Sequence, residues 1–263
     1  LQEWALPDGV ALRGLVLVVH GLGEHAGRYD ALAQFLVARG FAVRAYDHYG
    51  HGQSAGRRGT LSSDTRLLDD LADVVDATRE RMRSLGMPAS IPLILLGHSM
   101  GGLVAARFVA LRLRAVDALV LSSPALDAGM SAMQKRLLAV ALRLFPDLPL
   151  GNGLKPQFIS HDPAVVAAYV NDPQVHDRIS ARLAQFIASA GPATVAMASQ
   201  WTVPTLLLYA GDDRLLNADG SRRFAAAAPA GIVESRAFDT LWHEIFNERE
   251  PDRTQVLEAL ATW

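Results

Sequence analysis

The sequence predicts an α/β fold in which a mostly parallel central sheet is covered by helices on both faces and carries an inserted helical cap. Short apolar runs alternate with segments of helical spacing along most of the chain, which is typical of parallel strands joined by crossover helices. Half of the 263 residues are hydrophobic, which is enough for one large core. The alternation breaks between residues 124 and 203, where the insertion is expected.

The first part of the chain predicts two strands and two helices. Residues 14–20 form a continuous run rich in β-branched side chains, as expected of a strand buried on both faces. Residues 29–39 repeat apolar side chains at helical spacing, and residues 41–46 form the next strand. Residues 64–85 have the pattern of a long helix, with Asp64 as the expected N-cap.

The same alternation continues in the rest of the core. Strands are expected at residues 91–96, 118–122, 205–209 and 232–238, and a closing helix at residues 252–263. In a parallel sheet, reactive groups lie on loops at the carboxyl ends of the strands. Functional side chains are therefore expected directly after these strands.

The inserted segment combines helical patterns with many Pro and Gly residues. We interpret residues 124–203 as a helical cap, and residues 1–123 and 204–263 as the core that carries it. The alternative is a pair of ordinary crossover helices, but about 80 residues are far more than a crossover needs.

The composition excludes several classes of function. The formal net charge is −2, with acids and bases mixed along the chain, so neither a nucleic-acid surface nor a polybasic membrane patch is expected. The chain has no cysteine, which excludes disulfides, thiolate metal sites and a cysteine nucleophile. We expect no cofactor and no metal ion, because no His, Asp and Glu residues form a ligand set. The oligomeric state is left open.

Two uncharged stretches, residues 84–106 and 183–211, are long enough to span a membrane. Pro, Gly or Gln interrupts both, so they are interpreted as core segments. No signal peptide is recognised within these residues. We therefore expect a cytoplasmic protein that meets membranes at most peripherally.

Ser99 is the candidate nucleophile. It lies in the pentapeptide Gly97-His98-Ser99-Met100-Gly101, a G-x-S-x-G pattern between the strand at 91–96 and a helical pattern at 102–110. A serine on such a sharp turn points its oxygen out of the sheet, and the flanking residues must be small because the two backbones nearly touch. The alternative is a surface serine on a Gly-rich turn, but here both the strand and the helix are present.

The partners of this serine should follow later strands. A serine hydroxyl needs a base within hydrogen-bond reach, and the base needs a carboxylate to orient it, in the chain order serine, acid, histidine. Asp212 and Asp213 follow the strand at 205–209, and His243 follows the strand at 232–238. His243 is the candidate base, with a surface-loop histidine as the alternative. The sequence pattern does not decide whether Asp212 or Asp213 is the carboxylate that orients the base.

Backbone N–H groups should hold the oxyanion of a tetrahedral intermediate. One donor is the residue after the nucleophile, Met100, and the other lies on a loop after an early strand. The loop at residues 20–24 follows the strand at 14–20, and its glycines let the backbone approach the reacting centre.

Five segments resemble those of one enzyme family. Residues 20–29 (HGLGEHAGRY) are similar to the H-G-x-G-E-H-x-x-R-Y segment of monoacylglycerol lipases, and residues 47–54 (DHYGHGQS) to their D-H-x-G-H-G-x-S segment. Residues 97–102 match their nucleophile elbow, 206–216 resemble their acid loop, and 169–173 resemble a cap segment. The resemblance covers nearly the whole chain and identifies the monoacylglycerol lipase and lysophospholipase-like branch of the α/β-hydrolase family.

The resemblance implies residue roles. It selects Asp213, the Asp directly before Arg, as the triad acid, and it assigns the oxyanion positions to Leu22 and Met100. Three further residues fall where the family lines the polar pocket for the glycerol end of the substrate: Glu24, Arg28 and Tyr169. The alternative for Glu24 and Arg28 is a structural ion pair that holds the oxyanion loop.

Other histidines are expected to be structural. His48 and His51 should brace the loops beside the elbow, and His98 should point away from Ser99. Where mammalian members of the family carry a second histidine after the catalytic one, this chain has Phe246, a departure at the glycerol pocket.

These observations predict a serine ester hydrolase that cleaves acyl esters of medium to long chain, with monoacylglycerol as the best substrate. The alternatives are a lysophospholipase, a short-chain carboxylesterase, or a non-catalytic protein that binds ligands in the same pocket. The cap helix expected at residues 130–145 has apolar side chains that do not fit one narrow stripe, and it carries basic residues. We therefore expect either peripheral membrane contact through the cap or simple packing of the cap onto the core.

Overall fold

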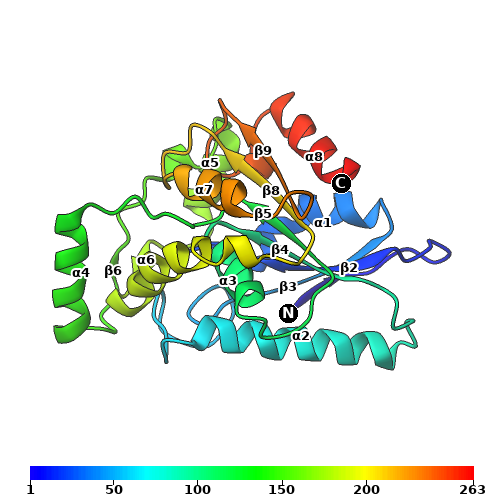
Figure 1. The fold of residues 1–263 in the computed structure, drawn as a ribbon, viewed down its shortest axis with the longest axis horizontal. Coiled ribbons are helices and arrows are strands. Elements are labelled where there is room, and N and C mark those ends of the chain that lie inside the picture. Colours follow the sequence, from blue (N-terminus) through cyan, green and yellow to red (C-terminus); the bar gives the residue numbers. More distant parts are fainter.

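The computed structural model describes residues 1–263 as a seven-stranded sheet with helices on both faces (Figure 1). The strand order is β1-β3-β2-β4-β5-β8-β9. Only β1 runs antiparallel, against β3, and the other neighbours are parallel, which confirms the predicted fold class. The strands are β1 Gln2–Trp4, β2 Gly14–Val19, β3 Phe41–Tyr46, β4 Leu93–His98, β5 Ala118–Ser122, β8 Thr205–Ala210 and β9 Val233–Phe238.

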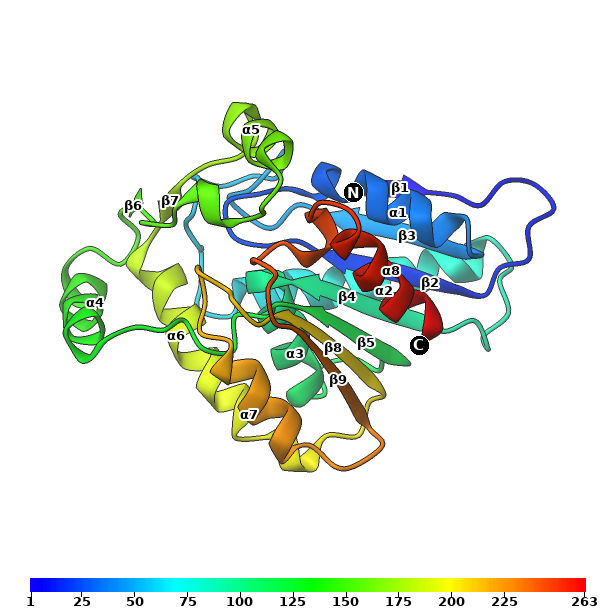
Figure 2. The same cartoon turned by 90° about the horizontal axis from the view of Figure 1, so that it is seen from above.

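The sheet separates two groups of buried apolar side chains. The smaller group contains residues of α1 (Asp30–Val37) and α8 (Asp252–Thr262), so these two helices cover one face (Figure 2). The larger group contains residues of the helices on the other face, which are α2 (Arg66–Ser84), α3 (Ser99–Ala110), α6 (Ala181–Val195) and α7 (Asp219–Ala227). β2, β4, β5 and β8 are buried almost throughout, as a parallel sheet between two helical layers requires.

Most predicted elements are found within a few residues of their expected bounds. The strands at 41–46 and 118–122 coincide with β3 and β5. β4 continues to His98, because His98 still pairs with Ser122 of β5. The predicted N-cap Asp64 is wrong: α2 has Thr65 at its N-cap position, and Asp64 instead forms an ion pair with Arg182 of α6 at 2.6 Å.

The segment between β5 and β8 is mostly helical. It contains α4 (Ala132–Leu144), α5 (Pro163–Asn171), α6 and the short 3-10 helices η2 (Pro156–Phe158) and η3 (Ala198–Gln200). The strands β6 (Leu150–Gly151) and β7 (Arg178–Ile179) pair to form a separate two-stranded sheet. α4 and α5 project beyond the edge of the main sheet, whereas α6 returns beside α3 (Figure 2).

The predicted division into core and cap therefore stays a prediction. α6 lies inside the range 124–203, yet its Leu183, Phe186 and Ile187 belong to the larger core group. The parts of the segment that stand apart from the core are α4, α5 and the two-stranded sheet. None of the helices combines the length and the apolar character needed to cross a membrane.

Candidate active site

Ser99 occupies the tight turn between β4 and α3. Its φ angle is +55°, in the left-handed region that a residue with a side chain adopts at a cost of about 1–3 kcal/mol. The glycines around it are needed for space. A Cβ atom on Gly101 would collide with the Val19 carbonyl oxygen, and one on Gly97 would collide with the Gly101 carbonyl oxygen. The turn thus holds the Ser99 side chain at the carboxyl end of the sheet.

Side chains from three separate loops meet at Ser99. His243 follows β9, and its Nε2 lies 2.8 Å from Ser99 Oγ. Asp213 follows β8, and its Oδ2 lies 2.7 Å from His243 Nδ1. The other Asp213 oxygen accepts backbone N–H groups of Leu215 and Leu216 at 2.9 and 3.0 Å. Asp213 and His243 both lie at the carboxyl ends of parallel strands, which is the position that the sequence predicts for them.

His243 and Asp213 each stabilise the charged form of the other. Burial disfavours the charged imidazole. The charge and hydrogen bond of Asp213, together with the charges of Glu244 and Glu24, outweigh this effect, so the pKa of His243 is raised above its usual value. Burial would also raise the pKa of Asp213, but the charge and hydrogen bond of His243 and the two backbone N–H groups lower it. Asp213 is therefore an ionised, oriented partner of His243 at neutral pH.

Asp212 has a different environment. It is exposed, and it forms an ion pair with Arg214 at 3.0 Å and accepts a hydrogen bond from the Trp242 indole at 3.3 Å. The structure thus separates the two neighbouring acids, which physical reasoning on the sequence left open. Asp213 faces His243, and Asp212 faces solvent.

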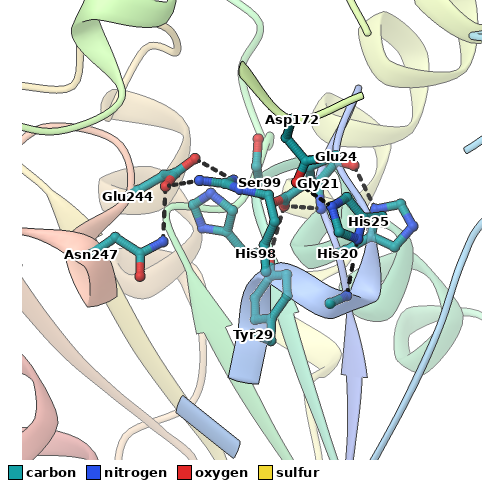
Figure 3. Close-up of polar contacts among 12 residues, drawn as sticks. His20, Gly21, Glu24, His25, Tyr29, His98, Ser99, Asp172, Glu244 and Asn247 are labelled. Atoms are coloured by element: carbon teal, nitrogen blue, oxygen red, sulfur yellow. Dashed lines mark hydrogen bonds and ion pairs between the residues drawn. The ribbon is translucent and has the colours of Figure 1, made fainter. Parts of the chain in front are cut away.

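The loop after β2 lies against the nucleophile. A Cβ atom on Gly21 would lie 3.2 Å from the Ser99 Cβ, so the backbone before Leu22 approaches the reacting centre closely. The Gly21 N–H donates to Glu24 Oε1 at 2.6 Å (Figure 3). Met100 begins the first turn of α3 directly after Ser99, so its N–H belongs to the free amides of that helix end.

Glu24 and Arg28 form an ion pair, as the structural alternative expects. Glu24 Oε1 also accepts the Tyr29 hydroxyl at 2.7 Å, and Glu24 Oε2 accepts Arg28 at 2.6 Å. Arg28 also binds both oxygens of Glu244 at 2.7 and 2.8 Å, and its guanidinium lies 4.7 Å from the centre of the Tyr169 ring. Glu244 is a member of this site that the sequence did not reveal, because it is separated from Arg28 by 216 residues.

A cavity of about 220 Å³ opens over Ser99 and His243. Its wall on the core side includes Leu22, Glu24 and Glu244, and Tyr169 of α5 closes it from the inserted segment. Arg28 is not in the wall and reaches the cavity only through its contacts with Glu24 and Tyr169. The inserted segment contributes both apolar and polar side chains to the wall. The apolar ones are Leu154, Pro156, Ile159, Val170 and Val175, and beside them lie Asn152, Lys155, His176 and Asp177.

The remaining histidines near the elbow are buried and neutral. His48 N–H donates to His20 Nε2 at 3.0 Å, and burial together with nearby His51 lowers the pKa of His20 to about 3. His98 hydrogen-bonds Ser122 at 3.1 Å instead of Ser99, and burial beside His243 lowers its pKa to about 4. No three His, Asp or Glu side chains of the chain converge in an arrangement that could hold a metal ion.

Comparison with known proteins gives consistent matches over nearly the whole chain. The Hydrolase_4 family, described as serine aminopeptidase S33, matches residues 11–250. A monoacylglycerol lipase of Mycolicibacterium smegmatis is 35% identical over 95% of this chain and 88% of its own length. The phospholipase YtpA of Bacillus subtilis is 30% identical over 98% of this chain and 96% of its own length.

Solved structures give the same result. The crystal structure of Paleococcus ferrophilus monoacylglycerol lipase is 33% identical to this chain, with a TM-score of 0.85. The match covers 100% of this chain and 96% of that one, so the similarity includes the inserted segment as well as the sheet.

Proposed function

Because this chain belongs to the Hydrolase_4 family of α/β-hydrolases, and within it to the branch of the monoacylglycerol lipases, we propose that it hydrolyses monoacylglycerol to fatty acid and glycerol through an acyl-enzyme on Ser99. The chain is a serine ester hydrolase. We propose acyl esters of medium to long chain as its substrate class. The observation that carries the proposal is the line of hydrogen bonds from Ser99 through His243 to Asp213, at 2.8 and 2.7 Å.

Acylation begins when Ser99 Oγ attacks the ester carbonyl carbon and His243 Nε2 takes its proton. Asp213 keeps the Nδ1 proton of His243 in place and stabilises the imidazolium that forms. When the tetrahedral intermediate collapses, the carbon–oxygen bond to glycerol breaks and His243 returns the proton to the glycerol oxygen. A water molecule then attacks the acyl-enzyme, His243 takes its proton, and Ser99 leaves and is reprotonated.

The Leu22 and Met100 N–H groups are proposed to hold the oxyanion of both tetrahedral intermediates. One such donor is typically worth about 3 kcal/mol of transition-state stabilisation, because it is oriented before charge develops. This assignment is supported by the close approach of the residue 21–22 backbone to Ser99 and by the position of Met100 at the start of α3.

Glu24, Arg28 and Tyr169 are proposed to bind the glycerol end of the substrate, Arg28 indirectly through the other two. Glu24 and Tyr169 contribute directly to the cavity wall, and Arg28 holds both in place. The acyl chain then follows the apolar side chains that the inserted segment contributes to the wall. A lysophospholipase would use the same groups, and the similarity to a phospholipase keeps that activity as the second candidate.

The cap is proposed to contact lipid surfaces. α4 buries only Leu138, and a row of large apolar side chains on and after it is exposed: Met133, Leu137, Val140, Leu144, Phe145, Leu148 and Leu150. Three basic residues accompany them: Lys135, Arg136 and Arg143. An amphipathic helix of this kind can lie in a membrane interface with its basic groups at the headgroups. The cytoplasmic location expected from the sequence stays a prediction.

The direct test is a substrate panel with purified protein. We expect the highest kcat/KM for 1-monoacylglycerols of medium or long chain, lower values for p-nitrophenyl butyrate, and the lowest for lysophosphatidylcholine. Ser99→Ala is the control for contaminating esterases. A preference for lysophosphatidylcholine over monoacylglycerol would replace the proposed substrate. No ester turnover, together with no reaction of Ser99 with a fluorophosphonate probe, would favour the binding-protein alternative.

A further inference from the structure

A chain of buried charges connects two loops of the site. Glu24 lies on the loop after β2, Arg28 lies in the 3-10 helix η1 (Ala26–Tyr29), and Glu244 precedes the 3-10 helix η4 (Ile245–Asn247). Arg28 bridges the two carboxylates, at 2.6 Å from Glu24 and 2.7 Å from Glu244. The three side chains are at most 11% exposed, so water screens their interactions very little. Figure 3 shows the Glu24 and Glu244 side chains near Ser99 and His98.

Each end of this charge bridge fixes a backbone segment that the reaction needs. At one end, Glu24 accepts the Gly21 N–H and thereby holds the His20–Gly21 peptide, which is adjacent to the peptide that carries the Leu22 N–H. At the other end, Glu244 directly follows His243 in the chain. Arg28 holds Glu244 with two parallel hydrogen bonds, and Asn247 donates a further one at 2.9 Å. The Glu244 N–H donates to the Ile159 carbonyl of the inserted segment at 2.8 Å.

Stability alone gives a weak reason for such a bridge. A buried ion pair can often be replaced by packed apolar side chains without loss of stability, because removing charges from water is costly. A bidentate Arg–carboxylate pair does, however, fix geometry in two directions. The bridge also carries two negative charges and one positive charge, and its net negative charge favours the imidazolium that His243 becomes in the transition state.

We propose that Glu244 is a positioning residue that, through Arg28 and Glu24, locks the loop of the general base to the loop of the oxyanion hole. This inference rests on the proposed function, since it takes His243 as the base and Leu22 N–H as an oxyanion donor. This connection keeps His243 and the Leu22 N–H correctly placed relative to each other while negative charge develops on the carbonyl oxygen of the substrate. Glu244 acts through these neighbours and exchanges no proton with the substrate.

Glu244→Gln is the main test, because it keeps the size of the side chain but removes its charge. On soluble p-nitrophenyl butyrate we expect kcat to fall about 10- to 100-fold with KM changed less than about threefold, the split expected when ground-state binding is retained. The acid limb of kcat/KM should also move to lower pH. The charged and titratable groups near His243 are Asp213, His98, Glu24, Arg28 and Glu244, and only Glu244 is altered in this variant.

A double-mutant cycle tests whether the bridge acts as one unit. Arg28→Lys loses the bidentate contact, so it should lower kcat by a similar factor, and the double variant should lose little more than the worse single one. Asp127→Asn is the matched control, because it breaks a more exposed ion pair, with Arg223 at 2.7 Å, away from the two loops. This control should keep kcat within about twofold, as expected for a surface site outside the network.

Several results would overturn the inference. One is a folded Glu244→Gln variant with kcat and acid limb unchanged, and another is a loss confined to KM. If Glu244→Gln does not fold, Glu244→Asp decides: the charge is kept and the reach is shortened, so kcat should fall while the acid limb stays in place, and an unchanged kcat contradicts the lock. A failure of the proposed function is seen separately, as missing monoacylglycerol turnover by the unaltered protein.

Discussion

Two regions of the molecule differ in how firmly their side chains are held. One is the floor of the cavity, formed by the catalytic residues, and the other is the outer part of the inserted segment, formed by α4 and α5. On the floor, Ser99, His243 and Asp213 each have fixed partners, and the His243 and Asp213 side chains are 7% and 3% exposed. In the inserted segment, α4 buries one side chain and α5 buries none. The catalytic residues therefore lie on firmly held turns at the carboxyl ends of the strands, whereas α4 and α5 are lightly packed.

Several polar contacts nevertheless join the two regions, and three of them lie close to the catalytic residues. The His176 N–H donates to the Gly23 carbonyl at 2.8 Å, and the Glu244 N–H donates to the Ile159 carbonyl at 2.8 Å. His25 Nε2 lies 2.8 Å from Asp172, at the end of α5. All three contacts end on the loops that carry the oxyanion donor or the base. This arrangement leads us to expect that changes on the floor affect every ester, and that changes on exposed parts of α4 affect only some.

The largest effect is expected on the floor. Ser99→Ala and His243→Ala should each lower kcat by about 10⁴- to 10⁶-fold on every ester, because the members of a triad act as a unit. Folding should be retained, which circular dichroism and the melting temperature would check. If either variant keeps more than roughly a tenth of the turnover, the roles assigned to these residues are wrong.

The neighbouring acids should differ strongly. Asp213→Asn should lower kcat by about 10⁴-fold, because it removes the group that fixes the tautomer of His243 and stabilises its charge. Asp212→Asn is the matched control, since its carboxylate pairs with Arg214 on the surface, and such pairs contribute little. Steady-state kinetics on one soluble ester would show the difference. Comparable losses in the two variants would mean that the acid is misassigned.

The pH profile should report the charge around His243. The base must be neutral to accept the Ser99 proton, and its folded pKa is raised, so kcat/KM should rise with pH through an apparent pKa above 6.5. His98 and His20, with pKa values near 4 and 3, stay neutral over this range and cannot produce that limb. Asp213→Asn should move the limb to lower pH in the residual activity. A limb that stays in place in this variant would show that another group titrates.

The smallest effect on soluble substrates is expected at exposed positions of α4. Leu137 is 62% exposed and Leu138 is 9% exposed, although they are neighbours. Leu137→Glu should weaken vesicle binding and long-chain monoacylglycerol hydrolysis, with p-nitrophenyl butyrate hydrolysis nearly unchanged. Leu138→Glu should lower the melting temperature by burying a charge. If Leu137→Glu reduced turnover of both esters equally, α4 would have no role at lipid surfaces.

Local patterns made the fold and much of the site predictable. The elbow could be located because a buried strand, a G-x-S-x-G turn and a helix follow one another within a short stretch, and His243 because it follows a strand. β1 was missed, since a three-residue edge strand has too little periodicity to recognise. Asp64 was misassigned because the cap rule is local, and the observed partner, Arg182, is 118 residues away.

The charge bridge could not be read from the sequence for the same reason. Glu24 and Arg28 have helical spacing, and the resemblance marked both, but only the fold brings Glu244 to Arg28. The membership of α6 in the core was hidden as well, because its apolar face has the same pattern whether it packs on another cap helix or on α3.

The central claim is that Ser99 is a nucleophile activated by His243, and covalent labelling tests it most directly. The unaltered protein would be treated with a fluorophosphonate probe, digested, and mapped by mass spectrometry, beside Ser99→Ala and His243→Ala. We predict one label per chain, on the peptide that contains Ser99, absent from Ser99→Ala and much slower to form in His243→Ala. Labelling at another residue, or at the same rate in His243→Ala, would contradict the account.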